Sequence, residues 1–284
     1  MRARAKRAPT PTPALATPGW RGGLLGPRLW WQEVIAMFVC YQVFERLRGV
    51  IPEPTVSPFH HALQVVRIER ALGLFREAAL QQWFLSSHLA IQFFDVYYGT
   101  VHFVIPVVAL VILWKRNRDR YVFMRNSAGF MLVLAFAGFL LWPLAPPRLL
   151  PASYHFVDTP ATIGGMGPLD RGNLKDDNQV AAMPSLHIGW STWCAVALLP
   201  VLRRRWAKAA IVAYPFLTLL TVIVTANHYW LDGVGGLVVL SAAMGLETLR
   251  SRAVSRAGAP SSSHPADVEA EHLRVAGVDG RHDP

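Results

Sequence analysis

Long apolar runs, separated by short basic stretches, occupy the middle of this sequence. Residues 96–114, for example, contain His102 but no Asp, Glu, Lys or Arg. A helix needs about 20 mostly apolar residues to cross the roughly 30 Å hydrocarbon core of a bilayer. We therefore predict an all-α, polytopic membrane protein whose helices form a six-helix transmembrane bundle. The predicted spans lie at about residues 30–48, 96–114, 121–142, 185–202, 209–227 and 229–248.

The composition supports this class and argues against others. Apolar residues make up 52% of the chain and charged residues 16%, whereas soluble domains average about 25% charged residues. The formal net charge of +10 comes largely from basic loops and ends, so it does not predict a nucleic-acid partner. Both cysteines, Cys40 and Cys194, lie in apolar runs, which argues against a disulfide scaffold or a cysteine metal site.

The two ends and one internal segment differ from the spans. Residues 1–28 are basic and rich in Pro, Ala and Thr, and residues 251–284 mix Ser, Pro, Gly and charges without periodicity. We predict that both are disordered tails around a membrane catalytic domain at 29–250. Residues 60–94 alternate apolar and charged side chains, so we predict an amphipathic outer segment rather than a span.

The loop charges predict the orientation of the spans. Basic clusters follow the second and fourth spans, at residues 115–120 and 203–208, and basic residues also fill the N-terminus. Lys and Arg are enriched in cytoplasmic loops. We therefore predict a multi-pass protein of the cell membrane, with both termini in the cytoplasm and residues 51–95 and 143–184 on the extracytoplasmic side.

Three polar clusters fall at span ends on that outer side. They are Ala145-Pro146-Pro147-Arg148-Leu149, Ala182-Met183-Pro184-Ser185-Leu186-His187 and Thr225-Ala226-Asn227-His228-Tyr229-Trp230-Leu231-Asp232. Ionisable residues inside membrane spans are costly, and by default they indicate a functional site. We expect the three clusters to meet at one depth of the membrane.

The last two clusters contain the elements of a histidine relay. His228 and Asp232 are four residues apart, so they share one face of a helix, and the carboxylate can orient the imidazole as a nucleophile or base. A pair that only stabilises the helix is the alternative. A second histidine, His187, can protonate a leaving group. Arg148 can hold a phosphate through its planar fork of donors, and free N–H groups at the helix start near Ser185 can add to anion binding.

These three motifs, in this order, resemble the type 2 phosphatidic acid phosphatase superfamily, and specifically its inositol phosphorylceramide synthase-like (inositolphosphotransferase) branch. The resemblance covers about residues 60–250. It implies a six-helix membrane fold in which His228 attacks phosphorus to give a phosphohistidine, Asp232 orients His228 and His187 protonates the leaving group. It implies no metal and no cofactor.

The chain also departs from the phosphatases of that superfamily. Leu186 stands where they usually have Gly, Val222 stands where they carry an Arg six residues before the nucleophilic His, and Arg148 belongs to a shortened first motif. These departures match the synthase-like branch and place more of the phosphate-holding role on Arg148. Which donor replaces the missing Arg stays open.

Further residues are candidates for binding substrate. Tyr98 and His102 lie in a region similar to that branch, and Asn227 precedes the proposed nucleophile; for His102, satisfying a neighbouring helix is the alternative. The acids of the outer loop match no metal-binding spacing, and we interpret them as solvated loop surface. These acids are Asp158, Asp170, Asp176 and Asp177.

The sequence thus predicts a lipid phosphotransferase or phosphatase that acts on a phospholipid or lipid-linked phosphate, with the bilayer as its surroundings. The acceptor is either an alcohol such as inositol or water, and these motifs do not decide between them. A transporter or non-catalytic scaffold is the alternative from another class, but it would be expected to show internal repeats or polar residues at the bilayer midplane. The oligomeric state is left open.

Overall fold

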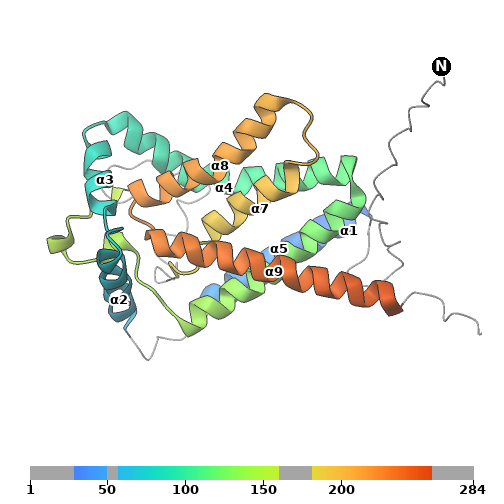
Figure 1. Ribbon diagram of the computed structural model, residues 1–284, viewed down its shortest axis with the longest axis horizontal. Coiled ribbons are helices and arrows are strands. Elements are labelled where there is room, and N and C mark those ends of the chain that lie inside the picture. The colour runs from blue at the N-terminus through green and yellow to red at the C-terminus, as the bar shows by residue number, and fades with distance from the viewer. Residues whose placement is uncertain (1–28, 50–56, 160–180, 258–284) are drawn as a thin grey trace, which may run out of the picture. The chain divides into compact units, whose positions relative to one another are not determined.

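The computed structural model describes residues 29–49, 57–159 and 181–257. The described residues form eight α-helices and two short 3-10 turns (Figure 1). Outside these elements, Leu144 and Ala181 form an isolated β-bridge. The helices are α1 (Trp30–Gly49), α2 (Pro58–Ala71), α3 (Glu77–Leu85), α4 (His88–Arg116), α5 (Arg118–Leu141), α7 (Leu186–Leu198), α8 (Arg205–Val224) and α9 (Trp230–Ala257); the 3-10 turns are η1 (Pro147–Leu149) and η2 (Ala152–Tyr154).

The chain divides into two compact units, Trp20–Glu247 and the two ends, Met1–Gly19 with Thr248–Pro284. The site residues predicted from the sequence all belong to the first unit. Of the second unit, the described residues are the last turns of α9. The predicted tail at 1–28, residues 258–284 of the predicted tail at 251–284, and the outer-loop acids Asp170, Asp176 and Asp177 lie outside the described residues. Residues 251–257 of that tail belong to α9.

Four helices are long and apolar enough to cross a membrane among the described residues: α4, α5, α8 and α9. They correspond to four of the six predicted spans, so the predicted number of six is not confirmed. The fourth predicted span corresponds to α7, which has 13 residues. This helix ends at Leu198, two residues before Pro200, which has no N–H with which to continue the helical hydrogen bonds.

Helix α7 packs against α4, α8 and α5 (Figure 1). Its largest side chain, Trp193, is fully buried and donates its indole N–H to the carbonyl of Met124 on α5 at 3.0 Å. In contrast, α4 and α8 expose Val107 and Phe216 on their outer faces. Apolar side chains exposed on long helices fit contact with lipid chains.

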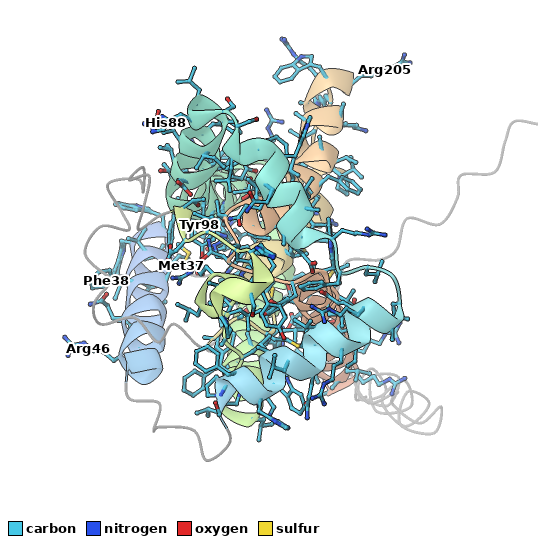
Figure 2. All side chains as sticks on the ribbon, turned by 90° about the vertical axis from the view of Figure 1, so that its left-hand side faces the viewer. Met37, Phe38, Arg46, His88, Tyr98 and Arg205 are labelled. Carbon is cyan, nitrogen blue, oxygen red and sulfur yellow. The ribbon has the colours of Figure 1, made fainter. Side chains whose placement is uncertain are left out.

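The first helix reaches the bundle through a buried ion pair. Glu33, which interrupts the first apolar run, pairs with Arg125 of α5 and accepts a hydrogen bond from the hydroxyl of Tyr121 at 3.0 Å. Phe38 and Arg46 of α1 project outward, whereas Tyr98 of α4 lies among the helices (Figure 2). A buried charge is stable only when it is paired, so the ion pair accounts for the burial of both Glu33 and Arg125.

The predicted amphipathic segment at 60–94 consists of α2, α3 and the beginning of α4. Helix α2 buries Ala62, Val65, Val66 and Glu69 on one face and exposes Ile68 on the other. It is tied to the end of α5, because the ring of His61 stacks on Trp142 at 4.1 Å and its Nδ1 lies 2.7 Å from the carbonyl of Pro143.

Glycines bring the first turns of α9 close to the start of α7. A Cβ atom on Gly236 would lie 2.3 Å from the carbonyl oxygen of Ser185, and one on Gly233 would lie 3.4 Å from Leu219 of α8. The N–H of Ser185 donates to the carbonyl of Asp232 at 3.0 Å. Because these glycines carry no side chain, the start of α9 can approach the start of α7. Asp232 and His187 therefore lie close together at the ends of neighbouring helices.

Candidate active site

The turn between α8 and α9 positions the predicted nucleophile. The N–H of Ala226 donates to the carbonyl of Ile223, and the N–H of Asn227 to that of Val222, which is the Schellman pattern that ends many helices. Ala226 has φ +52, a left-handed conformation that glycine usually adopts. The turn reverses the chain and places Asn227 and His228 directly after α8.

Asp232 holds the ring of His228 and also caps α9. Its Oδ2 accepts a hydrogen bond from the backbone N–H of Tyr229 at 2.9 Å and lies 3.2 Å from Nδ1 of His228. A carboxylate at this third helical position that bonds the N-cap N–H is half of a capping box. His228 is 5% exposed and Asp232 0% exposed. With Nδ1 engaged by the carboxylate, Nε2 of His228 is the nitrogen left to act.

His187 faces that nitrogen from the first turn of α7. Its Nδ1 lies 3.4 Å from Nε2 of His228, and the two ring centroids are 5.4 Å apart at 62°. The structure therefore brings together the three predicted catalytic residues, His228, Asp232 and His187, from two helix ends. Their roles in catalysis remain predictions.

Tyr98 and His102, which we predict to bind substrate, lie against His187. They are one turn apart on α4, and their rings lie 4.4 Å and 4.1 Å from the ring of His187, at interplanar angles of 23° and 37°. This contact makes them part of the surroundings of His187, whether or not they also touch substrate. The alternative, that His102 only satisfies a neighbouring helix, stays open, although its buried Nδ1 has no hydrogen-bond partner among the described residues.

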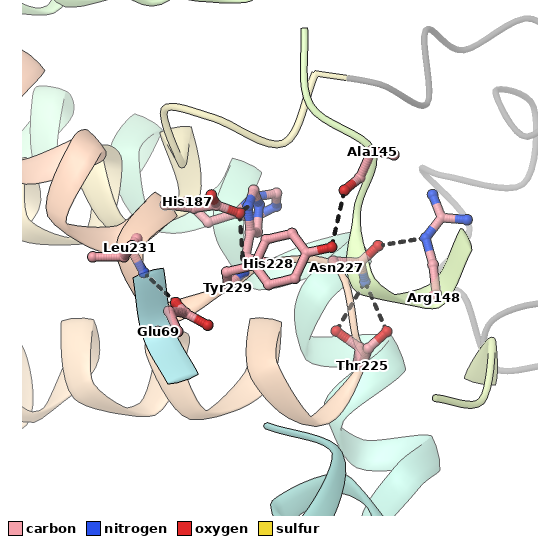
Figure 3. Close-up of polar contacts among 10 residues, drawn as sticks. Glu69, Ala145, Arg148, His187, Thr225, Asn227, His228, Tyr229 and Leu231 are labelled. Carbon is pink, nitrogen blue, oxygen red and sulfur yellow. Dashed lines mark hydrogen bonds and ion pairs between the residues drawn. The ribbon is translucent and has the colours of Figure 1, made fainter. Parts of the chain in front are cut away.

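Arg148 is hydrogen-bonded to the turn that carries His228. Its backbone N–H donates to the carbonyl of Ala226 at 3.0 Å, and its Nε donates to Oδ1 of Asn227, also at 3.0 Å (Figure 3). The amide of Asn227 is fixed in turn by a 2.9 Å hydrogen bond from its Nδ2 to Oγ1 of Thr225. Arg148 also pairs with Asp158 at 3.4 Å. Asn227 therefore positions the guanidinium, which is a different role from the direct substrate contact we predict.

Ser185 is only partly placed as expected. The residue is fully buried at the start of α7, but its N–H is occupied by the carbonyl of Asp232. The N–H of Ser185 itself is therefore not one of the free N–H groups expected at the helix start near Ser185, because the close approach of α9 through Gly236 brings a carbonyl to it. The buried Oγ of Ser185 has no hydrogen-bond partner among the described residues.

A buried glutamate, Glu69, supports the start of α9. Oε1 of Glu69 accepts the N–H of Leu231 at 2.9 Å, and both Glu69 and Glu77 are fully buried (Figure 3). Burial, together with the neighbouring carboxyl of Glu77, raises the pKa of Glu69 to about 9. Glu69 is therefore neutral at pH 7. In the sequence, the signal for this supporting role is a Glu at helical spacing from Ala62, Val65 and Val66, the apolar residues on the buried face of α2.

Sequence reasoning missed Gln81 and the fully buried Tyr229. Gln81 of α3 donates to the carbonyls of Val157 and Val224, at 2.8 and 3.0 Å. The hydroxyl of Tyr229 donates to the carbonyl of Ala145 at 3.2 Å. A polar residue in an apolar helix face is the only signal for Gln81. Within residues 29–49, 57–159 and 181–257, no group of three or more His, Cys, Asp or Glu is arranged to hold a metal ion.

Comparison with known proteins identifies the family. A family model described as the PAP2 superfamily matches residues 63–246, nearly two thirds of the chain. The chain matches no curated protein and no solved structure. The match spans all the predicted site residues and confirms the superfamily of the sequence resemblance, but not the inositol phosphorylceramide synthase-like branch. The chain therefore belongs to the PAP2 superfamily.

Proposed function

We propose that this protein is a membrane-embedded phosphatase or phosphotransferase that acts on a phospholipid or lipid-linked phosphate through a phosphohistidine at His228. Membership of the PAP2 superfamily supports a phosphatase-type enzyme, and four long apolar helices fit a membrane location. The observation that carries the proposal is the row of Asp232, His228 and His187, with 3.2 Å and 3.4 Å between their facing atoms.

In the first step, Nε2 of His228 attacks the substrate phosphorus. The P–N bond forms, the bond from phosphorus to the lipid oxygen breaks, and His187 gives its proton to that leaving oxygen. Asp232 stabilises the positive charge that develops on the ring of His228, as the carboxylate of a catalytic triad does. Arg148 offsets charge on the phosphoryl oxygens through its guanidinium N–H groups.

In the second step, water or an alcohol attacks the phosphohistidine. His187, now neutral, takes the proton of the attacking hydroxyl, the new P–O bond forms, and the P–N bond to His228 breaks. Both nitrogens return to their starting states, and no proton or electron is left over. Attack by water makes the enzyme a phosphatase, and attack by an alcohol such as inositol makes it a transferase.

The distance between the two histidines has a consequence for the first step. In-line attack places phosphorus between the nucleophile and the leaving oxygen, and 3.4 Å between Nε2 of His228 and Nδ1 of His187 leaves no room for it. We infer that the ring of His187 turns toward the leaving oxygen when substrate binds. The Tyr98 and His102 rings then define the surface along which it turns.

The proposal includes the orientation in the membrane. With the basic loops at 115–120 and 203–208 in the cytoplasm, the ends of α5 and α8 and the start of α7 lie on the extracytoplasmic side. Helices α1 and α7 would complete the six-helix bundle, with α7 reaching part of the way through the bilayer. Substrate would then come from the outer leaflet.

The direct test is product analysis with a labelled phospholipid. We expect purified protein in detergent to release a labelled phosphate compound from the lipid, and the product to change when inositol is added if an alcohol is the acceptor. His228→Ala should reduce turnover to background. His88→Ala, an exposed histidine at the start of α4, is the matched control and should retain turnover. Activity retained by His228→Ala would contradict the covalent mechanism.

A further inference from the structure

Asp158 lies beside the guanidinium that we propose to hold the substrate phosphate. Its Oδ2 is 3.4 Å from Nη1 of Arg148, and the side chains of Arg148 and Asp158 are 13% and 27% exposed. The sequence pattern indicated only a solvated loop acid. The structure instead places a carboxylate where a phosphate oxygen would be expected to approach Arg148.

The backbone on both sides of Asp158 is anchored. Gln81 accepts the N–H of Val157 at 2.9 Å and donates to its carbonyl at 2.8 Å. On the other side, the hydroxyl of Thr159, which is fully buried, donates to Oδ1 of Asp95 on α4 at 2.9 Å. A carboxylate between two anchored residues is held in place rather than free to leave with a loop.

The same glutamine connects Asp158 to the other partner of Arg148. Nε2 of Gln81 also donates to the carbonyl of Val224 at 3.0 Å, in the last turn of α8 just before Thr225 and Asn227. Asn227 binds Nε of Arg148 at 3.0 Å. The guanidinium therefore lies between an amide and a carboxylate, and Gln81 bonds the backbone near each of them, at Val157 and at Val224.

This pairing changes the charge that a substrate meets. A phosphate monoester carries about −1.5 to −2 charges at pH 7, because its second pKa is about 6, whereas a phosphodiester carries one. Asp158 offsets the positive charge of Arg148 and repels an approaching anion, and in a partly buried site this repulsion is weakly screened. The repulsion is about twice as large for a dianion as for a monoanion.

We propose that Asp158 is a specificity-determining residue: by pairing with Arg148 it disfavours dianionic phosphate monoesters relative to monoanionic phosphodiesters. The proposal rests on the proposed function, because it takes Arg148 to be the group that holds the substrate phosphate. It adds a criterion for substrate choice that does not depend on the identity of the lipid or of the acceptor.

The test compares two lipids in the same detergent micelles, phosphatidic acid as the monoester and phosphatidylinositol as the diester. We expect Asp158→Asn, which keeps the size of the side chain and removes the charge, to raise kcat/KM for the monoester at least tenfold relative to the diester at pH 7.5. Asp158→Ser should act in the same direction. Asp119→Asn is the control for charge, because Asp119 is exposed at the opposite end of α5 from Arg148.

The pH dependence provides a second readout that a structural effect would not produce. At pH 5 a phosphate monoester is mostly a monoanion. The ratio of kcat/KM for the monoester to that for the diester in Asp158→Asn should therefore fall toward the ratio measured for Asp119→Asn. Histidine titration in the enzyme cancels in the ratio of the two substrates. Stronger inhibition of Asp158→Asn by inorganic phosphate at pH 7.5 than at pH 5 should accompany this change.

An unchanged ratio in both Asp158 variants, or an equal loss with both lipids, would overturn the proposal and leave Asp158 as a support for Arg148. Failure of the proposed function is distinguishable, since the unaltered protein would then turn over neither lipid, or His228→Ala would remain active. Phosphate inhibition unchanged in Arg148→Ala would show that another group holds the phosphate.

Discussion

At the scale of single residues, Asp232 combines a structural and a chemical task. One carboxylate oxygen binds both the N–H of Tyr229 and the ring of His228. The sequence left open whether this pair only stabilises the helix or orients a nucleophile. The contact with His187 on the far side of His228 favours the second interpretation, because a purely structural pair needs no third group there.

Replacing Asp232 separates the two tasks. We expect Asp232→Asn to lower kcat on the order of 10⁴-fold, since loss of the orienting carboxylate in a catalytic triad has an effect of this size. Loss of the charged cap should reduce stability by only about 1 kcal/mol. Turnover and thermal unfolding measured on the same samples check this, and a fall in activity no larger than the loss of folded protein would favour the purely structural pair.

Tyr98 offers a test of the ring contacts around His187. An aromatic pair contributes about 0.5–1.5 kcal/mol beyond buried area, so we expect Tyr98→Leu to lower kcat by up to about tenfold. Tyr98→Phe keeps the ring that lies 4.4 Å from His187 and should retain most of the rate. If both variants lost activity equally, the hydroxyl rather than the stacked ring would be the important group.

At the scale of helices, the site depends on how closely α9 approaches α7. We expect Gly236→Ala to destabilise the fold by about 1–3 kcal/mol, the usual cost of overpacking, because its Cβ would meet the Ser185 carbonyl at 2.3 Å. Gly245→Ala, on the same helix with nothing within 4 Å, is the control and should stabilise by up to about 1 kcal/mol. Similar unfolding temperatures for the two variants would contradict this packing.

The contact between α2 and α9 predicts a pH dependence of stability. The pKa of Glu69 is about 9 in the fold against an ordinary value of 4.5, so the folded state holds a proton that the unfolded state releases. The stabilisation is complete below about pH 4.5 and is lost as pH rises toward about 9. We expect Glu69→Gln, which can still accept the N–H of Leu231, to show a flatter fall in unfolding temperature between pH 5 and 9. Parallel curves would mean that Glu69 is already ionised in the fold.

At the scale of the whole molecule, the sequence predicted the groups that lie close along the chain better than those joined by tertiary contacts. The pair of His228 and Asp232 was expected from helix spacing, although His228 lies just before α9 and the contact forms across the N-terminus of that helix. Its approach to His187 was expected from the predicted span ends. The pairing of Arg148 with Asp158, and the bridging role of Gln81, depend on chain paths between distant segments that no periodicity encodes. The short α7 was missed because an apolar run continues past Leu198 although Pro200 stops the helix.

The orientation in the membrane is a prediction at this scale. In a variant without Cys40 and Cys194, a cysteine replacing the exposed Ser153 should react with a membrane-impermeant thiol reagent on intact cells. One replacing the exposed Asn117, between α4 and α5, should react only after the membrane is opened. The reverse pattern would place the candidate site on the cytoplasmic side.

The central claim is that His228 forms a covalent bond to phosphorus. Rapid mixing with a lipid donor labelled in its phosphate, followed by alkaline quenching and peptide mass analysis, tests this most directly. We predict a labelled phosphoryl or phosphate-ester group on His228 that appears before product and is absent from His228→Ala. Label on another residue, or full turnover without label on His228, would contradict the mechanism.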